Sequence, residues 1–240
     1  MGQTDKQLRY MEAMGIQAWR LRQAPPAEIQ VETDQPVVEE KIPGETGTAQ
    51  FLPRVAVKQD WPALEAKIKS CLLCELHQQR TQSVPGVGNH NADWMVIGEA
   101  PGVDEDRQGE PFVGRAGKLL DQMLLAIGLK RETVYITNIV KCRPPGNRDP
   151  KPEEAASCEA YLKRQIAMVQ PKIILAVGRI AAHNLLKTDQ RVGAMRGQRF
   201  EYADTGIPVV VTYHPAYLLR SPTEKRKAWQ DLLLARSLMT

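Results

Sequence analysis

The chain has 240 residues, 42% of them hydrophobic, and a formal net charge of +4 at pH 7. This composition supports the core of one large domain, or of one domain with an extension, and no apolar run approaches the ~20 residues of a membrane-spanning helix. The positive balance permits a polyanionic partner without requiring one. The first residues lack the apolar segment of a secretory signal peptide, so we expect a cytoplasmic protein.

Residues 1–58 differ in composition from the rest of the chain, and we expect them to form a separate segment. Residues 7–22 carry apolar side chains, including Trp19, at helical spacing. Residues 24–57 are rich in Pro, Gly, Glu, Gln and Thr without a clear period, which is typical of a flexible linker. Two interpretations stay open for residues 7–22: a peptide that docks on another protein, and a helix packed on the main domain.

Residues 59–240 alternate between strand and helix patterns. We expect strands at residues 93–98, 133–138, 172–177, 198–202 and 208–213, and helices at residues 61–70, 116–127, 152–169, 179–186 and 223–238. This alternation predicts an α/β fold, in which a mostly parallel central sheet lies between two layers of helices.

A long loop, residues 98–117, joins the first strand to the next helix. It contains five acidic residues, with Glu99 directly after the strand and Phe112 between Pro111 and a pair of glycines. Open parallel sheets bind ligands at the carboxyl ends of their strands, and loops of this length in compact domains are usually functional. We therefore expect the loop to line a ligand site.

Four cysteines are present: Cys71, Cys74, Cys142 and Cys158. Disulfides are a poor explanation in a reducing cytoplasm. The first pair has a chelating spacing, and four thiolates suit a structural zinc ion or a [4Fe–4S] cluster, while four unrelated buried thiols are the third possibility. The wide spacing of the second pair favours iron–sulfur.

Three strand ends carry polar groups that should converge on one edge of a parallel sheet. Glu99 follows the first strand, Asn138 ends the second and His214 follows the last. Each has an ordinary explanation, because Glu99 can cap its loop, Asn138 can satisfy backbone groups, and His214 can belong to the core. Together with the Phe112 ring they suggest a nucleic-acid site, because amides read base edges and aromatic rings stack on bases.

The motifs that surround these residues resemble those of family 4 uracil-DNA glycosylases, the iron–sulfur members of the uracil-DNA glycosylase superfamily. The similar segments are residues 98–102, 111–117, 138–145 and 214–220. The resemblance covers about residues 60–240 and includes all four cysteines in the family's order. It implies a three-layer α/β/α sandwich of the uracil-DNA glycosylase type.

The resemblance also implies a role for each matching residue. The four cysteines would ligate a [4Fe–4S] cluster, Phe112 would stack on a uracil flipped out of DNA, and Asn138 would read the Watson–Crick edge of that uracil. His214 would stabilise charge on the leaving uracil, and Glu99 would lie at the water and sugar side. Two small residues, Gly98 and Ala100, would complete the pocket.

The resemblance implies a DNA surface as well, on either single- or double-stranded DNA. Leu218, Leu219 and Arg220 match the loop that enters the DNA stack. The cluster would shape a basic loop beside it, and the further residues expected to contact DNA are Arg143, Arg148, Lys151 and Ser221.

Two positions depart from the wider superfamily. Ala100 stands where the best-known branch has an Asp for water activation, and Gly102 stands where that branch has a tyrosine that blocks thymine. We expect either that Glu99 takes over part of the missing role or that catalysis depends more on electrostatics.

Residues 11–22 are similar to the start of the psi subunit of bacterial DNA polymerase III, which docks on the chi subunit. This similarity predicts that residues 7–22 tether the chain to chi. The main alternative for the whole chain is a non-catalytic iron–sulfur DNA-binding protein of the same fold. A nucleotide-cofactor enzyme is disfavoured, because the loop after the first strand has neither glycine-rich phosphate-binding pattern.

Overall fold

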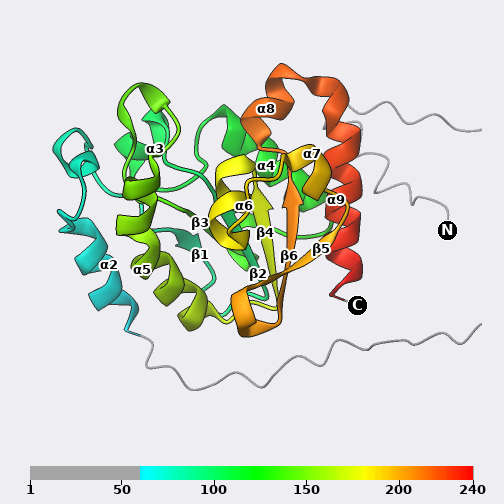
Figure 1. Ribbon diagram of the computed structural model, residues 1–240, viewed down its shortest axis with the longest axis horizontal. Coiled ribbons are helices and arrows are strands. Elements are labelled where there is room, and N and C mark those ends of the chain that lie inside the picture. The colour runs from blue at the N-terminus through cyan, green and yellow to red at the C-terminus, as the bar shows by residue number, and fades with distance from the viewer. Residues whose placement is uncertain (1–59, 240) are drawn as a thin grey trace, which may run out of the picture.

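The computed structural model describes residues 60–239, which form a mixed sheet between two layers of helices (Figure 1). The strand order is β1-β3-β2-β4-β6-β5. The four inner strands are parallel, and β1 and β5 pair antiparallel at the two edges. The strands are β1 (Val87–Gly88), β2 (Trp94–Gly98), β3 (Tyr135–Asn138), β4 (Ile173–Val177), β5 (Arg199–Tyr202) and β6 (Ile207–Thr212). The prediction of a mostly parallel sheet is confirmed.

The helices divide between the two faces of the sheet. One face is covered by α2 (Trp61–Lys69), α5 (Pro152–Val169), α6 (Arg179–Leu186) and α7 (Val192–Met195). The other face is covered by α4 (Arg115–Ala126), α8 (Pro215–Arg220) and α9 (Lys225–Ser237), and the short α3 (Val103–Gln108) precedes α4. Single turns of 3₁₀-helix lie at Glu75–Gln78, Arg131–Thr133, Pro145–Asn147, Ala203–Thr205 and Pro222–Glu224.

The central strands are apolar on both faces because both faces are covered. In β2, Met95 and Ile97 belong to the core under α2, α5 and α6, whereas Trp94 and Val96 belong to the core under α4 and α9. All five residues of β2 are buried. A continuous apolar run is the expected pattern for a strand buried in this way.

The predicted strands and longer helices are present, with ends that differ by up to two residues in most cases. Short elements were missed: β1, α3, α7 and α8. Each has at most six residues, too few to show a period. The last helix begins at Lys225, because Pro222–Glu224 form a 3₁₀ turn before it.

The predicted docking segment and linker, residues 1–58, lie outside the described residues, as do residues 7–22 within them. Among residues 60–239, every helix is too short or too polar to cross a bilayer.

The connections of β2 make its carboxyl end a natural ligand site. The chain leaves β2 through α4 to reach β3 on one side, and then crosses through α5 to β4 on the other side of β2. The two crossovers lie on opposite faces of the sheet (Figure 1). The end of β2 is therefore the point at which the two crossovers diverge, and open sheets bind ligands at such points.

A buried polar network fixes the end of β3 to α5. Gln165 is fully buried, and its Nε2 donates to the Pro85 carbonyl at 2.8 Å and to the Tyr135 hydroxyl at 3.0 Å. Thr137 Oγ1 donates to the same Pro85 carbonyl at 2.7 Å. Buried polar groups stabilise a fold only when they are paired, so Gln165 holds β3 in place through these partners.

We expect Gln165→Leu to lower the free energy of unfolding by about 1–3 kcal/mol, because it leaves the buried Tyr135 hydroxyl without a partner. Urea denaturation followed by tryptophan fluorescence measures this. The matched control is Gln230→Leu on the exposed side of α9, which should change stability by less than about 0.5 kcal/mol. Equal effects of the two substitutions would contradict the structural role of Gln165.

Candidate active site at the carboxyl edge of the sheet

Gly98, the last residue of β2, lies between an amide and an aromatic ring. It is in register with Asn138, the last residue of β3. A Cβ atom on Gly98 would lie 2.5 Å from Asn138 Oδ1 and 2.5 Å from Phe112 Cζ. Only a residue without a side chain allows the ring and the amide to approach the strand end so closely.

The backbone of Phe112 is in an unusual conformation, with φ at +54°. Two side chains hold the turn in which it lies. Arg131 donates to the carbonyls of Pro111 and Phe112, and Glu105 accepts hydrogen bonds from Val113 N at 3.0 Å and Gly114 N at 3.1 Å. Such strained conformations persist where surrounding contacts over-determine them, and they cluster at functional sites.

Asn138 is buried, with 1% of its surface exposed, and its Oδ1 has no hydrogen-bond partner in residues 60–239. The buried Lys141 side chain fixes its backbone, because Lys141 Nζ donates to the Asn138 carbonyl at 2.7 Å. A buried amide oxygen without a partner is costly. It is therefore a site at which a bound donor would be stabilised.

His214 lies two residues after the end of β6 and caps the N-terminus of α8. Its Nδ1 accepts a hydrogen bond from Ala216 N at 3.1 Å, so the ring carries its proton on Nε2. Burial, together with the Arg220 cation, lowers the pKa of His214 to about 4. The ring lies 5.7 Å from that of Phe112. His214 is consequently a neutral hydrogen-bond donor at physiological pH.

Glu99 lies next to a second carboxylate that the sequence did not suggest. The Asp149 carboxyl group lies near Glu99, and Arg179 Nη2 donates to Asp149 Oδ2 at 2.5 Å. Burial and the Asp149 charge raise the pKa of Glu99 to about 7, and Arg179 opposes this shift. Ala100 packs against the core under α2, α5 and α6 and offers no polar group.

The four cysteines converge on one small cavity. All four line it, together with apolar side chains that include Ile68 and Tyr161. Arg80 Nη1 donates to Cys142 Sγ at 2.9 Å, and its Nη2 donates to the Cys71 carbonyl at 3.0 Å. Between residues 60 and 239, no three His, Cys, Asp or Glu side chains are grouped so that they could hold a metal ion. The four thiols therefore share one cavity.

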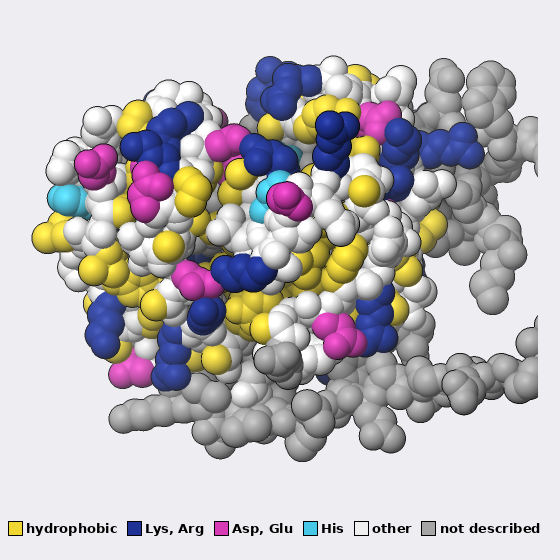
Figure 2. All heavy atoms as spheres, viewed as in Figure 1, with side chains coloured by type: hydrophobic (Ala, Val, Ile, Leu, Met, Phe, Trp, Pro, Cys, Tyr) yellow, Lys and Arg dark blue, Asp and Glu magenta, His cyan; other side chains and the backbone are white. Residues whose placement is uncertain are grey.

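The residues predicted to contact DNA divide into several groups. Arg220 and Leu219 are exposed on α8, and Ser221 is half-buried at its end. Arg143 donates to Asn147 at 2.7 Å, Lys151 is half exposed, and Arg148 forms a bidentate pair with Glu154 at 2.6 and 2.8 Å. Figure 2 shows Lys and Arg side chains gathered over the end of the molecule where α8 and the start of α9 lie.

Leu218 requires a correction. The sequence analysis placed it in a loop that enters the DNA stack, but it lies on α8 with 1% of its surface exposed. It belongs to the core under α4 and α9. The helical turn points it inward and leaves Tyr217 and Leu219 on the outer side, with 36% and 37% of their surfaces exposed.

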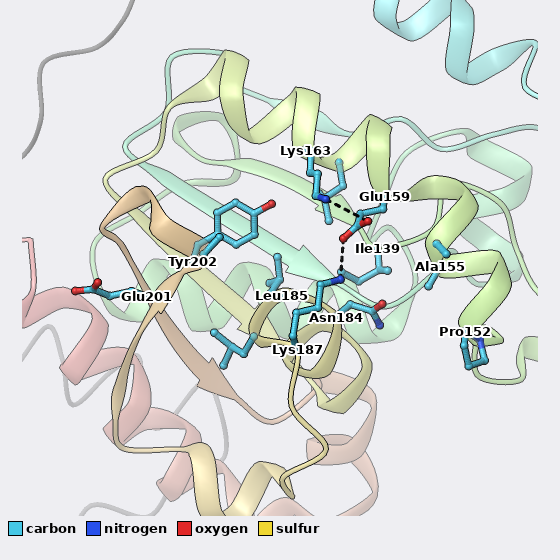
Figure 3. Close-up of a pocket in the computed structure, with 14 residues that line it drawn as sticks. Ile139, Pro152, Ala155, Glu159, Lys163, Asn184, Leu185, Lys187, Glu201 and Tyr202 are labelled. Atoms are coloured by element: carbon cyan, nitrogen blue, oxygen red, sulfur yellow. Dashed lines mark hydrogen bonds and ion pairs between the residues drawn. The ribbon is translucent and has the colours of Figure 1, made fainter.

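A separate cavity of about 400 Å³ lies between α5, α6 and β5 (Figure 3). Glu159 bridges Lys163 and Lys187 at its margin, and Leu185 and Tyr202 line it. Ile139 is its nearest link to the site described above, because that residue follows Asn138 in the chain. Gly98, Glu99, Phe112, Asn138 and His214 do not line this cavity.

Sequence reasoning missed five residues that shape the two sites: Arg80, Glu105, Arg131, Asp149 and Arg179. Arg179 had a signal, since it follows Gly178 directly after β4, and the sequence analysis did not include the end of this strand among those that carry site residues. Arg80, Arg131 and Asp149 act across longer sequence separations, and Glu105 acts on its own loop eight and nine positions later; no periodic pattern marks any of them.

The chain matches the family model described as "Uracil DNA glycosylase superfamily" over residues 85–233. This segment includes all six strands of the sheet and contains the whole carboxyl edge described above, from Gly98 to Ser221. The chain therefore belongs to the uracil-DNA glycosylase superfamily.

Several relatives carry the name Type-4 uracil-DNA glycosylase. The protein of Archaeoglobus fulgidus is 49% identical over 171 residues, which are 69% of this chain and 86% of the relative. The protein of Sulfurisphaera tokodaii is 43% identical over 182 residues, 73% of this chain and 83% of the relative. That of Thermotoga maritima is 41% identical over 174 residues, 71% and 90% of the two chains. The predicted resemblance to family 4 is confirmed.

Gly117 tests how tightly the Phe112 turn is packed. A Cβ atom on Gly117 would lie 1.8 Å from the Phe112 carbonyl oxygen, so Gly117→Ala must displace the backbone of the turn. We expect the free energy of unfolding to fall by about 1–3 kcal/mol in urea denaturation. The control is Gly193→Ala, where the new methyl group meets only the Tyr213 hydroxyl at 3.8 Å and stability should be kept or slightly raised. Unchanged stability of Gly117→Ala would show that the turn can move freely.

Proposed function

We propose that this chain is a DNA repair enzyme that flips uracil out of DNA and hydrolyses its glycosidic bond, leaving an abasic site. The observation that carries the proposal is the grouping of the Phe112 ring, the unpaired Asn138 oxygen and the neutral His214 around Gly98. A base inside a duplex is out of reach of such a site, so it must be extruded, at a cost of a few kcal/mol.

Asn138 is proposed to recognise the base. Its unpaired Oδ1 accepts a hydrogen bond from uracil N3–H, and its amide nitrogen donates to O4. Cytosine presents the opposite pattern at these two positions, so a buried amide in one orientation discriminates strongly against it. Phe112 stacks on the ring of the bound base.

His214 is proposed to stabilise the leaving group. As the C1′–N1 bond breaks, its electron pair moves to uracil and negative charge develops on the ring oxygens. The Nε2–H of neutral His214 donates to O2, where the fixed donor acts like an oxyanion hole and contributes roughly 3 kcal/mol. The neutral ring suits this role because it needs no change of protonation state.

Glu99 is proposed to activate water at the sugar side. Its carboxylate accepts a proton from water as the water oxygen bonds to C1′, and its negative charge favours the positive charge that develops on the sugar. With a pKa of about 7, Glu99 is both ionised in part at neutral pH and a stronger base than an ordinary carboxylate. Glu99 therefore takes over part of the role that Ala100 cannot fill.

A [4Fe–4S] cluster is proposed as the cofactor, held by Cys71, Cys74, Cys142 and Cys158. The four thiols line one cavity, and four cysteine thiolates are the ligand set of a [4Fe–4S] cluster. When bound, the cluster supplies structural cross-links. The chain's own contribution is to tie α2, α5 and the loop after β3 together, with Arg80 donating to Cys142.

The basic surface at α8 and the loop after β3 is proposed to bind the DNA backbone. Arg220 and Arg143 supply cations there, and Leu219 is exposed enough to enter the stack where Leu218 is not. Arg148 remains a proposed DNA contact, although Glu154 pairs with it here. Docking of residues 7–22 on the chi subunit and a cytoplasmic location also remain proposals.

Glu99→Gln tests the function and the role of Glu99 together. We expect the wild-type chain to release uracil from a single-stranded oligonucleotide and to leave the matching thymine oligonucleotide intact. Glu99→Gln should slow uracil release by about 100- to 10,000-fold in single-turnover assays, because it removes the carboxylate that accepts the proton from water. Oligonucleotide affinity, measured by fluorescence anisotropy, should stay within about twofold. A wild-type chain that binds but never releases uracil would instead be the non-catalytic alternative.

Cys158→Ser tests the cofactor independently of activity. The wild-type protein should absorb visible light and contain iron, and Cys158→Ser should lose both, because one of four thiolate ligands is removed. His77 lines the same cavity, so His77→Gln is the matched control and should keep its colour. A colourless wild-type protein that contains zinc would contradict the cluster, because zinc has a filled d shell.

A further inference from the structure

Three charged residues follow three neighbouring strands and lie close together at the carboxyl edge of the sheet. Glu99 follows β2, Asp149 comes from the segment after β3, and Arg179 begins α6 directly after β4. These strands are adjacent in the sheet, in the order β3-β2-β4. The Asp149 carboxyl group lies near Glu99 and accepts a hydrogen bond from Arg179 Nη2 at 2.5 Å.

The backbone of Asp149 is fixed from outside this trio. Arg148 Nη1 donates to the Asp149 carbonyl at 2.9 Å, and Arg148 itself forms the bidentate pair with Glu154. Glu154 also accepts from Lys151 N at 2.7 Å at the start of α5. The loop is therefore held in place even without the Arg179 contact, so substitution of either Asp149 or Arg179 leaves a defined loop.

We propose that Asp149, held by Arg179, is a positioning residue that sets the charge state of Glu99 for water activation. This inference rests on the proposed uracil excision and deepens it. Asp149 thereby supplies, from another loop, a carboxylate near the reacting sugar that position 100 lacks in this chain.

The chemistry follows from the unequal surroundings of the two carboxyl groups. Two carboxylates in contact do not ionise equally easily. Asp149 is 58% exposed and paired with the Arg179 cation, whereas Glu99 is more enclosed. The charged groups that face Glu99 are Asp149 and Arg179, and burial with the Asp149 anion raises the Glu99 pKa to about 7.

A base whose pKa is near the working pH combines a useful ionised fraction with strength as a proton acceptor. In the step itself, the water oxygen bonds to C1′, its proton passes to ionised Glu99, and the C1′–N1 electron pair leaves with uracil. Protonated Glu99 cannot accept that proton. The rate should therefore fall as pH drops through the Glu99 pKa.

The test is the pH dependence of single-turnover uracil release, measured from about pH 5 to about pH 9 with saturating enzyme and a single-stranded uracil oligonucleotide. Asp149→Asn removes the anion, so the Glu99 pKa should fall. The acidic limb of the pH–rate profile, where the rate rises with pH, should then move to lower pH by about 1 pH unit. Its rate at high pH should also fall, because a carboxylate of lower pKa is a weaker base. Arg179→Gln removes the opposing cation, so its acidic limb should move to higher pH.

Opposite shifts from the two variants distinguish this role from a structural one, which would slow release without moving the limb. Arg199→Gln, which breaks the exposed pair with Glu201 on β5, is the matched control and should leave the profile unchanged. If the acidic limb of the Asp149→Asn profile were identical to that of the wild-type profile, the inference about Asp149 would be overturned, and the proposed uracil excision would be unaffected. Absence of release by the wild-type chain would instead overturn the proposed function.

Discussion

The parallel pairing of β3, β2 and β4 is the constraint on which the site depends. Each strand is buried on both faces, so hydrogen bonds and apolar side chains fix its register. That register places Gly98 beside Asn138 and lets the following residues of all three strands meet at one edge. Because Gly98 has no side chain, the Phe112 ring and the Asn138 amide can both lie against the strand end.

Several polar groups at this edge are buried in ways that lower the stability of the folded protein. Asn138 Oδ1 is buried without a partner, burial keeps His214 neutral, and Glu99 resists ionisation. Proteins keep such groups where a ligand or a reaction uses them. In the proposed function, a flipped uracil donates to the Asn138 oxygen and accepts a hydrogen bond from His214, so that groups unfavourable in the free protein would contribute to binding and catalysis.

The sequence predicted most of the sheet and the main site residues, because buried strands and strand-end motifs have strong local patterns. It failed at α8, which has only six residues, and so it assigned Leu218 to DNA when the helix turns that side chain into the core. It also left the role of the Ala100 position open. The carboxylate beside Glu99 comes from Asp149, which lies fifty positions later in the chain, and no periodic pattern connects two such positions.

The sequence by itself determined the α/β class, the four cysteines, and the identity of the ring, amide, imidazole and carboxylate at the site. These follow from hydrophobic period and from motifs that are continuous in the chain. Only the tertiary structure decided that Arg131 and Glu105 hold the Phe112 turn, that Arg80 reaches Cys142, and that Arg179 fixes Asp149 near Glu99. Side-chain contacts between distant segments depend on register and packing, which exist only once the sheet has formed.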